Sequence, residues 1–278
     1  MPAMPEDQGT RYDRIAVGYA RHWAPVIRPA ALRLLDNLAR RLPAGARDAI
    51  DIGTGTGTLA FGALERWPAL QVTGIDGSSE MAAWAGREAD ERLGPADRGR
   101  FRTVVALADR LPMEDGAFDF AMSSFVFQLV PNRAAALREA RRVLRPGGIL
   151  GYVTWLRSSP GLDPPDAVLE EVLDEFGFDP PEPDSDRGDP ASPRAATEGL
   201  RRAGFRDVRA HEDVLAHRWT PRSYVDFVEH FAEESLFDDL VERERLALRR
   251  RLLQRVGALA PRDLRLRMPI VYAVGRAD

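Results

Sequence analysis

Apolar side chains recur along the chain with two different periods. Over residues 10–42 they return every three or four positions, up to the break at Pro43-Ala44-Gly45, which predicts amphipathic helix. Short apolar runs predict strands over residues 48–52, 71–76, 101–106, 118–124 and 149–155. Helical patterns separate most of these strands, over residues 58–66, 80–92 and 134–144. Strands that alternate with helices predict a parallel sheet with helices on both faces.

The pattern changes after residue 155. Helices are predicted over residues 166–176, 194–203 and 221–259, and strands over residues 207–219 and 267–274. The helical segments 166–176 and 221–259 fall between late strands, so we expect them to form a cap over a pocket rather than a separate domain. A turn at Arg145-Pro146-Gly147-Gly148 is expected before the fifth strand. The length of 278 residues suits one large domain with an insertion.

Composition excludes several kinds of chemistry. The chain has no cysteine, which rules out disulfides, thiolate metal sites and cysteine nucleophiles. Its four histidines form no H-x-x-x-H pair, so we expect no metal site. The net charge of −4 gives no overall attraction to nucleic acid. No apolar run approaches the ~20 residues that span a bilayer, and the N-terminus lacks a signal-peptide core, so the cytoplasm is the expected compartment.

Three glycines follow the first predicted strand at every second position. Gly53, Gly55 and Gly57 come shortly after Asp51 and precede an apolar segment that starts a helix. Glycine allows the positive φ and the close backbone approach that a ligand-binding turn requires. A dinucleotide fingerprint needs a glycine where this chain has Thr58, which disfavours a nicotinamide-dependent dehydrogenase. The loop suits the amino acid part of a ligand, or alternatively it is an ordinary turn of an α/β protein.

A carboxylate ends the second predicted strand. Asp76 stands where it can accept both hydroxyl groups of a ribose. Alternatively it belongs to a helix cap, since Asp76-Gly77-Ser78-Ser79 directly precedes a helix; the two roles are compatible. Gly53, Asp76, Ala108 and Ser124 all lie at carboxyl ends of predicted strands. Ligands bind at that edge of parallel sheets, so we expect one pocket to collect these residues.

Four phrases in this order make the chain resemble the class I S-adenosylmethionine-dependent methyltransferases, in particular the ubiquinone/menaquinone-biosynthesis type. They read DIGTGTGTLA, VTGID, LPMEDGAFDFAMSSFVFQLV and REARRVLRPGGILGYV. The resemblance covers residues 12–155 and the terminal strands. It implies a three-layer αβα Rossmann-like sheet, mostly parallel with an antiparallel last strand, and a helical cap inserted among the late strands. The regions implied are lid helices over 1–45, a cofactor-binding core over 46–157, cap insertions over 158–193 and 221–260, and the remaining sheet over 194–220 and 261–278.

The resemblance also implies S-adenosyl-L-methionine as cofactor and S-adenosyl-L-homocysteine as product. The loop that holds the methionine part corresponds to Asp51, Gly53, Thr54, Gly55 and Gly57. The other implied contacts are Asp76 at the ribose, Gly77 and Met81 at the adenine, Ser124 at the sulfonium, and Tyr12 and Tyr19 as closing aromatics. Leu107 departs from the family, which commonly has an aspartate there. The Ala108 backbone and the Asp109 side chain are the candidates left to meet the adenine ring.

Methyl transfer from a sulfonium is an in-line displacement, which mainly requires the reacting groups to be held in alignment. A general base helps only a nucleophile that carries a proton, so the catalytic residues stay unknown. The candidate bases are His22, His217 and His230, with a structural or surface role as the alternative. The candidates for the acceptor pocket, or alternatively plain core residues, are Phe125, Phe127, Gln128, Trp155, Trp219, Tyr224 and Phe227.

Two absent sequence features narrow the range of possible methyl acceptors. Ser123-Ser124-Phe125-Val126 stands where enzymes that methylate base amines carry Asn/Asp-Pro-Pro-Tyr/Phe, and the missing cysteine excludes the covalent route to 5-methylpyrimidines. A cap with aromatic residues favours a small or lipid-like acceptor. We therefore expect a methyltransferase that acts on a small, partly apolar molecule, with no nucleic acid partner and no membrane span. The alternative is a catalytically inactive protein of the same fold that binds the cofactor for regulation. The sequence leaves the oligomeric state open.

Overall fold

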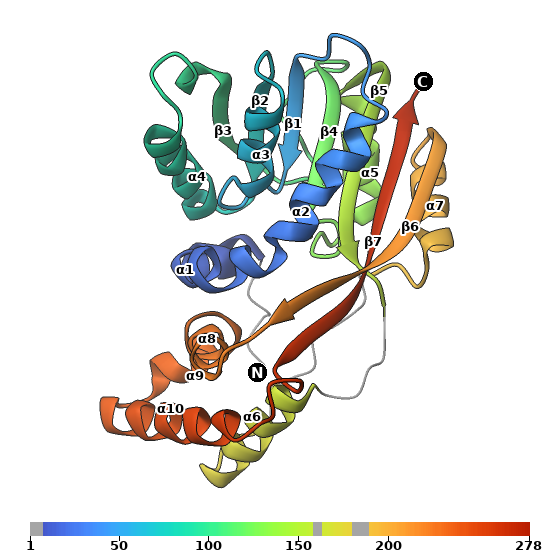
Figure 1. The fold of residues 1–278 in the computed structure, drawn as a ribbon. Coiled ribbons are helices and arrows are strands. Elements are labelled where there is room, and N and C mark those ends of the chain that lie inside the picture. Colours follow the sequence, from blue (N-terminus) through green and yellow to red (C-terminus); the bar gives the residue numbers. More distant parts are fainter. Residues whose placement is uncertain (1–7, 158–162, 180–188) are drawn as a thin grey trace, which may run out of the picture.

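The computed structural model describes residues 8–157, 163–179 and 189–278. Within these ranges it forms a seven-stranded sheet in the order β3-β2-β1-β4-β5-β7-β6 (Figure 1). The strands are β1 Asp48–Ile52, β2 Gln71–Asp76, β3 Phe101–Val105, β4 Phe118–Ser124, β5 Leu144–Trp155, β6 Phe205–Arg218 and β7 Arg265–Ala277. The strands β1 to β5 pair in parallel, and β7 runs antiparallel to both β5 and β6. The predicted fold class, with its antiparallel last strand, is confirmed.

The first strand lies in the centre of the sheet because its side chains are apolar on both faces. Ile50 and Ile52 are fully buried on one face, and Ala49 is fully buried on the other. In β1, Asp51 lies opposite Gly74 of β2 and Met122 of β4. The carboxyl ends of these parallel strands therefore meet at one edge of the sheet, where ligands of such folds bind.

Helices cover both faces of the sheet. The helices α2 (Ala24–Ala39), α3 (Thr58–Arg66) and α4 (Ser79–Arg92) share one apolar cluster with the sheet, and α5 (Arg133–Arg142) and α7 (Pro193–Arg202) share the other. Leu34 and Leu38 of α2 are fully buried and lie directly over Gly151 of β5. The predicted lid region 1–45 therefore divides into two parts, because its helix α2 packs on the sheet and belongs to the helical layer that covers it. The segment over the ligand edge is α1 (Gln8–Gly18) with the π-helix η1 (Tyr19–Trp23), which we call the lid.

A group of helices lies beyond the carboxyl ends of the strands, at the lower end of Figure 1. It comprises α6 (Pro164–Glu175), α8 (Pro221–Phe227), the π-helix η4 (Val228–Ala232), α9 (Glu234–Asp239) and α10 (Glu242–Gly257), and we call it the cap. The cap is carried by the long strands β6 and β7, and its apolar residues belong to the cluster that includes α2 and α3. Of the predicted insertion 158–193, residues 158–162 and 180–188 lie outside the described ranges.

Two predictions about local structure are wrong. The helix predicted over 221–259 breaks at Glu233, where φ is −118° and ψ is 29°, and again near Leu240, which is extended. The predicted turn Arg145-Pro146-Gly147-Gly148 is a bulge inside β5, because Leu144 pairs with Phe118 and Ile149 pairs with Phe120. Gly147 has a φ of +80° in this bulge, which explains why turn residues appear inside a strand.

Among the helices that the structure describes, none combines the length and the apolarity needed to cross a membrane.

Candidate cofactor and acceptor site

The glycine loop follows β1 and leads directly into α3. Gly53, Gly55 and Gly57 have φ values of +73°, +53° and +83°, a region that disfavours other residues. A Cβ atom at Gly53 would overlap the side chain of Val126, so the loop also lies tightly against the segment after β4. The backbone N–H groups of Gly53 and Thr54 donate to the Ile75 carbonyl oxygen at 2.7 and 2.8 Å, which fixes the loop to β2.

Asp51 is buried beneath this loop, with only 1% of its surface exposed. Its Oδ2 accepts a hydrogen bond from Thr54 Oγ1 at 2.9 Å, whereas its Oδ1 has no hydrogen bond of regular geometry among the described residues. Burial raises the pKa of the Asp51 carboxyl to about 7. The Ala60 N–H at the start of α3 lies close enough to act on the pKa of this carboxyl, and it acts in the opposite direction. A buried oxygen without a regular hydrogen bond is costly, so this carboxylate is poised to accept a donor or a cation from a ligand.

Asp76 joins the glycine loop to the start of α4. Its Oδ2 accepts from the Gly55 N–H at 2.8 Å, and its Oδ1 accepts from the Ser78 N–H at 2.9 Å. Ser78 is the N-cap of α4, since its Oγ accepts from the Met81 N–H at 3.1 Å. Burial raises the pKa of the Asp76 carboxyl, while these N–H donors act in the opposite direction. Ser78 therefore caps the helix, and Asp76 lies at the ligand edge.

Large apolar side chains lie at the end of β3, at the same edge of the sheet as Asp76. Leu107 is 60% exposed and Val105 is 55% exposed at the end of β3, which is unusual for large apolar residues. Leu107 Cδ2 lies 3.3 Å from the position that a Cβ of Gly77 would take. Met81 is buried in the first turn of α4. Ala108 and Asp109 follow in the same segment and are half-buried.

Tyr19 of the lid covers the glycine loop. Its hydroxyl oxygen lies 3.6 Å from the position that a Cβ of Gly55 would take, and its ring meets Tyr12 edge to face with 5.9 Å between centroids. The space beneath is a cavity of about 20 Å³, lined by Tyr19, Ile27, Ala31, Asp51, Gly53, Thr54, Thr56, Thr58, Leu59 and Ser124. The lid is therefore closed over the predicted cofactor residues.

Beside this cavity lies a group of rings that we call the aromatic cluster: Tyr19, Trp23, Phe125, Trp155, Trp219, Phe227 and Phe231. Trp23 is central, since its ring lies 6.0 Å from Trp155, 5.2 Å from Phe227 and 5.7 Å from Phe231. Phe125 has a φ of +57°, a strained conformation for a residue with a side chain, and its ring lies 4.2 Å from Trp155. The cluster thus joins the lid, the sheet and the cap next to Ser124.

Comparisons with known proteins agree with this geometry. A family model described as a methyltransferase domain matches residues 50–151. The nocamycin O-methyltransferase of Saccharothrix syringae is 30% identical over 228 residues, which cover 73% of this chain and 74% of that protein. The chain belongs to the S-adenosylmethionine-dependent methyltransferases.

Other members of the family match a shorter part of this chain. The demethylmenaquinone methyltransferase of Thermus thermophilus is 43% identical over 101 residues, which cover 36% of this chain and 44% of that protein. Several curated relatives are matched over only 34–54% of their own length. Among solved structures, the [4+2]-cyclase SpnF has a TM-score of 0.57 and 26% identity, and the match covers 99% of this chain and 97% of that one.

The residues at the ligand edge fit the cofactor of this methyltransferase family. The Asp51 Oδ1, which has no regular hydrogen bond, offers an acceptor for the ammonium group of the methionine part, and the glycine loop forms a cradle that side chains would fill. Asp76 offers carboxylate oxygens to the ribose hydroxyls. Leu107, beside Gly77, offers an apolar surface to the adenine ring in place of the hydrogen bond that an aspartate would accept.

One predicted pocket residue lies outside the aromatic cluster. Phe127 is buried on the opposite face of the sheet, where its ring meets Tyr152 edge to face at 5.3 Å. The Tyr224 hydroxyl donates to Asp166 Oδ1 at 2.7 Å inside the cap, and the Tyr224 ring lies 5.9 Å from Trp219 and 6.4 Å from Phe227 at the border of the cluster. Gln128 accepts a hydrogen bond from Thr154 Oγ1 at 2.6 Å. The structure therefore brings together Phe125, Trp155, Trp219 and Phe227, but leaves Phe127 outside the aromatic cluster.

Two members of the cluster were missed by the sequence reasoning. Trp23 lies four residues after Tyr19 on the lid, and Phe231 lies four residues after Phe227 on the cap. Residues four apart share a face of a helix, so this spacing was the signal that connected each of them to a predicted pocket residue.

The candidate bases fall into two places. His22 of the lid and His230 of the cap face each other with 5.2 Å between ring centroids. Burial lowers the pKa of His22, and the neighbouring His230 lowers it further. His217 lies against Trp219 at 4.5 Å, and burial lowers its pKa too. None of the three lines the cavity beneath Tyr19.

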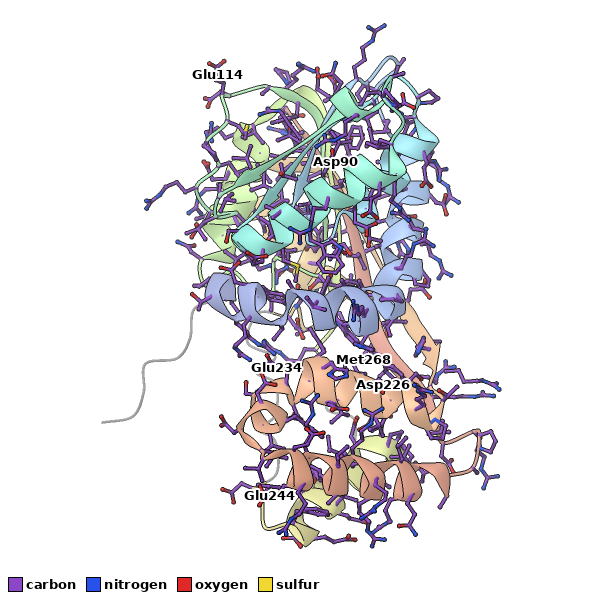
Figure 2. The ribbon with its side chains drawn as sticks, turned by 90° about the vertical axis from the view of Figure 1, so that its left-hand side faces the viewer. Asp90, Glu114, Asp226, Glu234, Glu244 and Met268 are labelled. Carbon is purple, nitrogen blue, oxygen red and sulfur yellow. The ribbon has the colours of Figure 1, made fainter. Side chains whose placement is uncertain are left out.

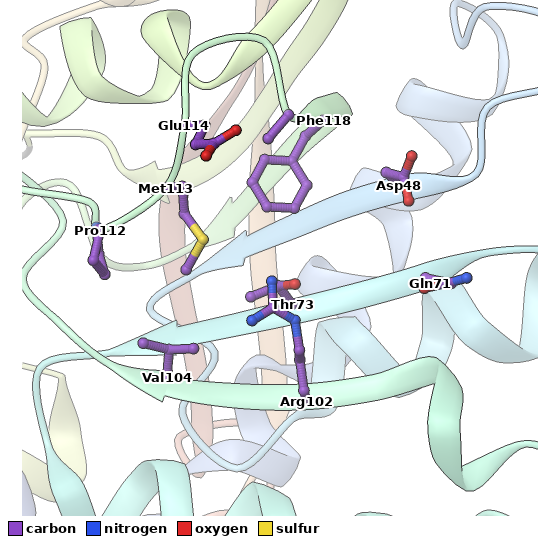
Figure 3. A pocket seen from close by; sticks show the side chains of 10 residues that line it. Asp48, Gln71, Thr73, Arg102, Val104, Pro112, Met113, Glu114 and Phe118 are labelled. Carbon is purple, nitrogen blue, oxygen red and sulfur yellow. The ribbon is translucent and has the colours of Figure 1, made fainter.

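A larger cavity, of about 490 Å³, lies away from this site. It opens at the amino-terminal half of the strands and is lined by Asp48, Gln71, Thr73, Arg102, Val104, Pro112, Met113, Glu114, Ala117 and Phe118 (Figure 3). No helix is present between β3 and β4 in this described stretch, so the face of β2 and β3 stays partly uncovered there. The glycine loop does not reach this cavity, so size alone does not identify the cofactor site.

Proposed function

We propose that this protein transfers a methyl group from S-adenosyl-L-methionine to a small, partly apolar molecule. The observation that carries the proposal is the buried Oδ1 of Asp51, without a regular hydrogen bond, beneath a glycine cradle. Asp76 and the exposed Leu107 continue the same edge of the sheet, as the ribose and adenine parts of the cofactor require. Family membership supports this assignment, because the relatives named above carry methyltransferase names.

The chain's own residues would act by holding and shielding the reacting groups. The bound cofactor supplies a methyl group on an activated sulfonium, so alignment provides most of the rate enhancement. Asp51 and the glycine loop would hold the amino acid end, and Asp76 would orient the ribose. Phe125 and Trp155 would exclude water beside Ser124, which strengthens the interactions of the sulfonium charge. The candidate bases for an acceptor that carries a proton stay His22, His217 and His230.

The acceptor side is the aromatic cluster. Its rings come from the lid, the sheet and the cap, so a small molecule bound there would be enclosed by apolar surface on several sides. The relatives named nocamycin O-methyltransferase and demethylmenaquinone methyltransferase bear names that differ in the methyl acceptor. The absence of a nucleic acid partner and the cytoplasmic location stay predictions.

Calorimetry with S-adenosyl-L-homocysteine tests the cofactor assignment. Asp76→Ala removes a charged acceptor of two hydrogen bonds, so we expect the affinity to fall at least tenfold, which equals about 1.4 kcal/mol. Glu91→Ala is the matched control, because Glu91 is an exposed carboxylate on α4 and should bind as the wild type does. Binding that is absent in the wild type, or undiminished in Asp76→Ala, would refute the assignment.

A transfer assay tests the reaction itself. Phenols, quinols, carboxylic acids and amines are incubated with the protein and methyl-labelled cofactor, and transferred label is measured. We expect transfer to at least one class of partly apolar acceptor. Binding of S-adenosyl-L-homocysteine without transfer to any member of the panel would favour the inactive, regulatory alternative.

A further inference from the structure

The lid and the cap meet through two π-helices. One is η1, at the end of the lid, and the other is η4, in the cap, and each is a single wide turn. Such turns are rare and often lie at functional positions. Gly18, which directly precedes η1, packs against the backbone carbonyl of His230 so closely that a Cβ atom there would overlap the carbonyl oxygen. Glycine at this position is therefore what allows the two turns to touch.

Side chains extend this contact on both sides. Arg14 of α1 forms an ion pair with Glu234, the first residue of α9. Figure 2 shows Glu234 on the cap directly below the lid helix. Tyr19 meets Phe231 at 5.9 Å between ring centroids, and His22 meets His230 at 5.2 Å. The lid is thus held by the cap along its length rather than at one point.

The opposite side of the lid contacts the predicted cofactor residues. Asp13 accepts a hydrogen bond from Ser78 Oγ at 2.6 Å and another from the Glu80 N–H at 3.0 Å. These donors lower the pKa of the Asp13 carboxyl, so it is charged at neutral pH. Ser78 in turn donates its N–H to Asp76. The lid is therefore hydrogen-bonded to the start of α4, next to the residue that joins α4 to the glycine loop.

The closed lid blocks the way to the glycine loop. The cavity beneath Tyr19 measures about 20 Å³, the size of one water molecule, so it offers a small molecule no passage past the Tyr19 ring. The lid has to move for a ligand to enter or leave. The cap side of the contact is the fixed side, because Glu229 in η4 is buried and paired with Arg245 and Arg249 of α10.

We propose that the lid and the cap form one gate, in which the contact between Gly18 and His230 holds the cofactor site closed. The gate makes cofactor exchange depend on the cap, which also carries the acceptor-side rings Phe227 and Phe231. If the acceptor and the cofactor both bind more tightly to the closed gate, each raises the affinity for the other by the same factor. This inference rests on the proposed function for the identity of the ligand, but the lid contact itself is independent of it.

The test compares Gly18→Ala with Gly86→Ala. A Cβ atom at Gly86, in α4, has no neighbour within 4 Å, so this variant controls for the loss of a helical glycine. Release of S-adenosyl-L-homocysteine is followed by stopped-flow tryptophan fluorescence, and protection of residues 8–23 by hydrogen exchange. We expect Gly18→Ala to release the ligand at least tenfold faster and to lose protection of the lid, and Gly86→Ala to match the wild type. Wild-type release and protection in Gly18→Ala would overturn the gate.

A second variant keeps the test decisive if Gly18→Ala does not fold. Glu234→Gln removes the Arg14 ion pair at the surface, and we expect it to raise the release rate two- to threefold with partial loss of lid protection. Lost protection with an unchanged release rate would mean that the contact is only structural, and would also overturn the gate. If the wild type does not bind the ligand, the proposed function fails, while hydrogen exchange in the two variants still tests the contact.

Discussion

At the scale of single residues, Asp51 combines a structural cost with a binding role. Its pKa of about 7 means that the folded protein holds the proton more tightly than the unfolded chain does. Stability from this group is therefore lost as the pH rises from about 4 to about 7. The charged form that costs stability above pH 7 is also the form that attracts an ammonium group.

We expect the affinity for S-adenosyl-L-homocysteine to depend on this titration. Above pH 7 the carboxylate is charged and the affinity should be constant, whereas below pH 7 the ligand must displace a proton. The affinity should then fall by up to tenfold per pH unit. Calorimetry between pH 5.5 and 8.5 measures the slope, and Asp51→Asn should bind more weakly with no slope in this range. An equal slope in Asp51→Asn would assign the titration to another group.

Two phenylalanines show which part of the site could not be predicted from the sequence. Asp51, Asp76 and the three glycines could be placed because strand ends and glycine spacing are local features of the chain. Phe125 and Phe127 were both predicted as candidates for the acceptor pocket. The left-handed conformation of Phe125 redirects the chain after β4, so Phe125 joins the aromatic cluster and Phe127 lies on the other face.

At the scale of elements, periodicity located most helices and strands, but not the breaks inside the cap. The strands β2 and β4 and the helix α3 have the predicted bounds, since apolar runs and flanking glycines define them. Glu233 and Leu240, where the cap helices break, have neither glycine nor proline beside them. The two π-helices meet at the tertiary contact of Gly18 with His230, and residues that far apart in sequence give no local signal of such a contact.

A buried ion-pair network joins the π-helix η4 to α10, and it leads to a prediction about stability. Glu229 is 4% exposed, and its carboxylate oxygens are paired with Arg245 and Arg249. Glu229→Gln leaves Arg245 without this charged partner and leaves Arg249 with Asp226, so we expect a loss of roughly 2 kcal/mol in the free energy of unfolding. Glu175→Gln is the control, because it removes pairs with Arg251 and Arg255 at the surface.

Urea unfolding at equal ionic strength measures both variants. We expect Glu175→Gln to unfold close to the wild type, since exposed pairs contribute little. Equal midpoints for Glu229→Gln and Glu175→Gln would mean that the network in η4 does not hold the cap together.

At the scale of the whole molecule, the cap and the sheet share one apolar cluster. Val172 of α6 and Leu248 of α10 belong to the same buried cluster as Leu34 of α2 and Phe120 of β4. A cap that buries its side chains together with those of the sheet loses them when either part unfolds. We therefore expect one thermal transition, in which the calorimetric and van't Hoff enthalpies agree, although the chain exceeds the usual size of two-state domains.

The variant Glu229→Gln separates this prediction from that of an independently folded cap. In one cooperative unit, a defect in η4 lowers the midpoint of the single transition and leaves its shape unchanged. In an independent cap, the same defect would produce an early transition of small enthalpy, followed by a later one at the wild-type temperature. Because the gate requires the cap to be held firmly by the sheet, two separate transitions would also remove the fixed side on which the closed lid depends.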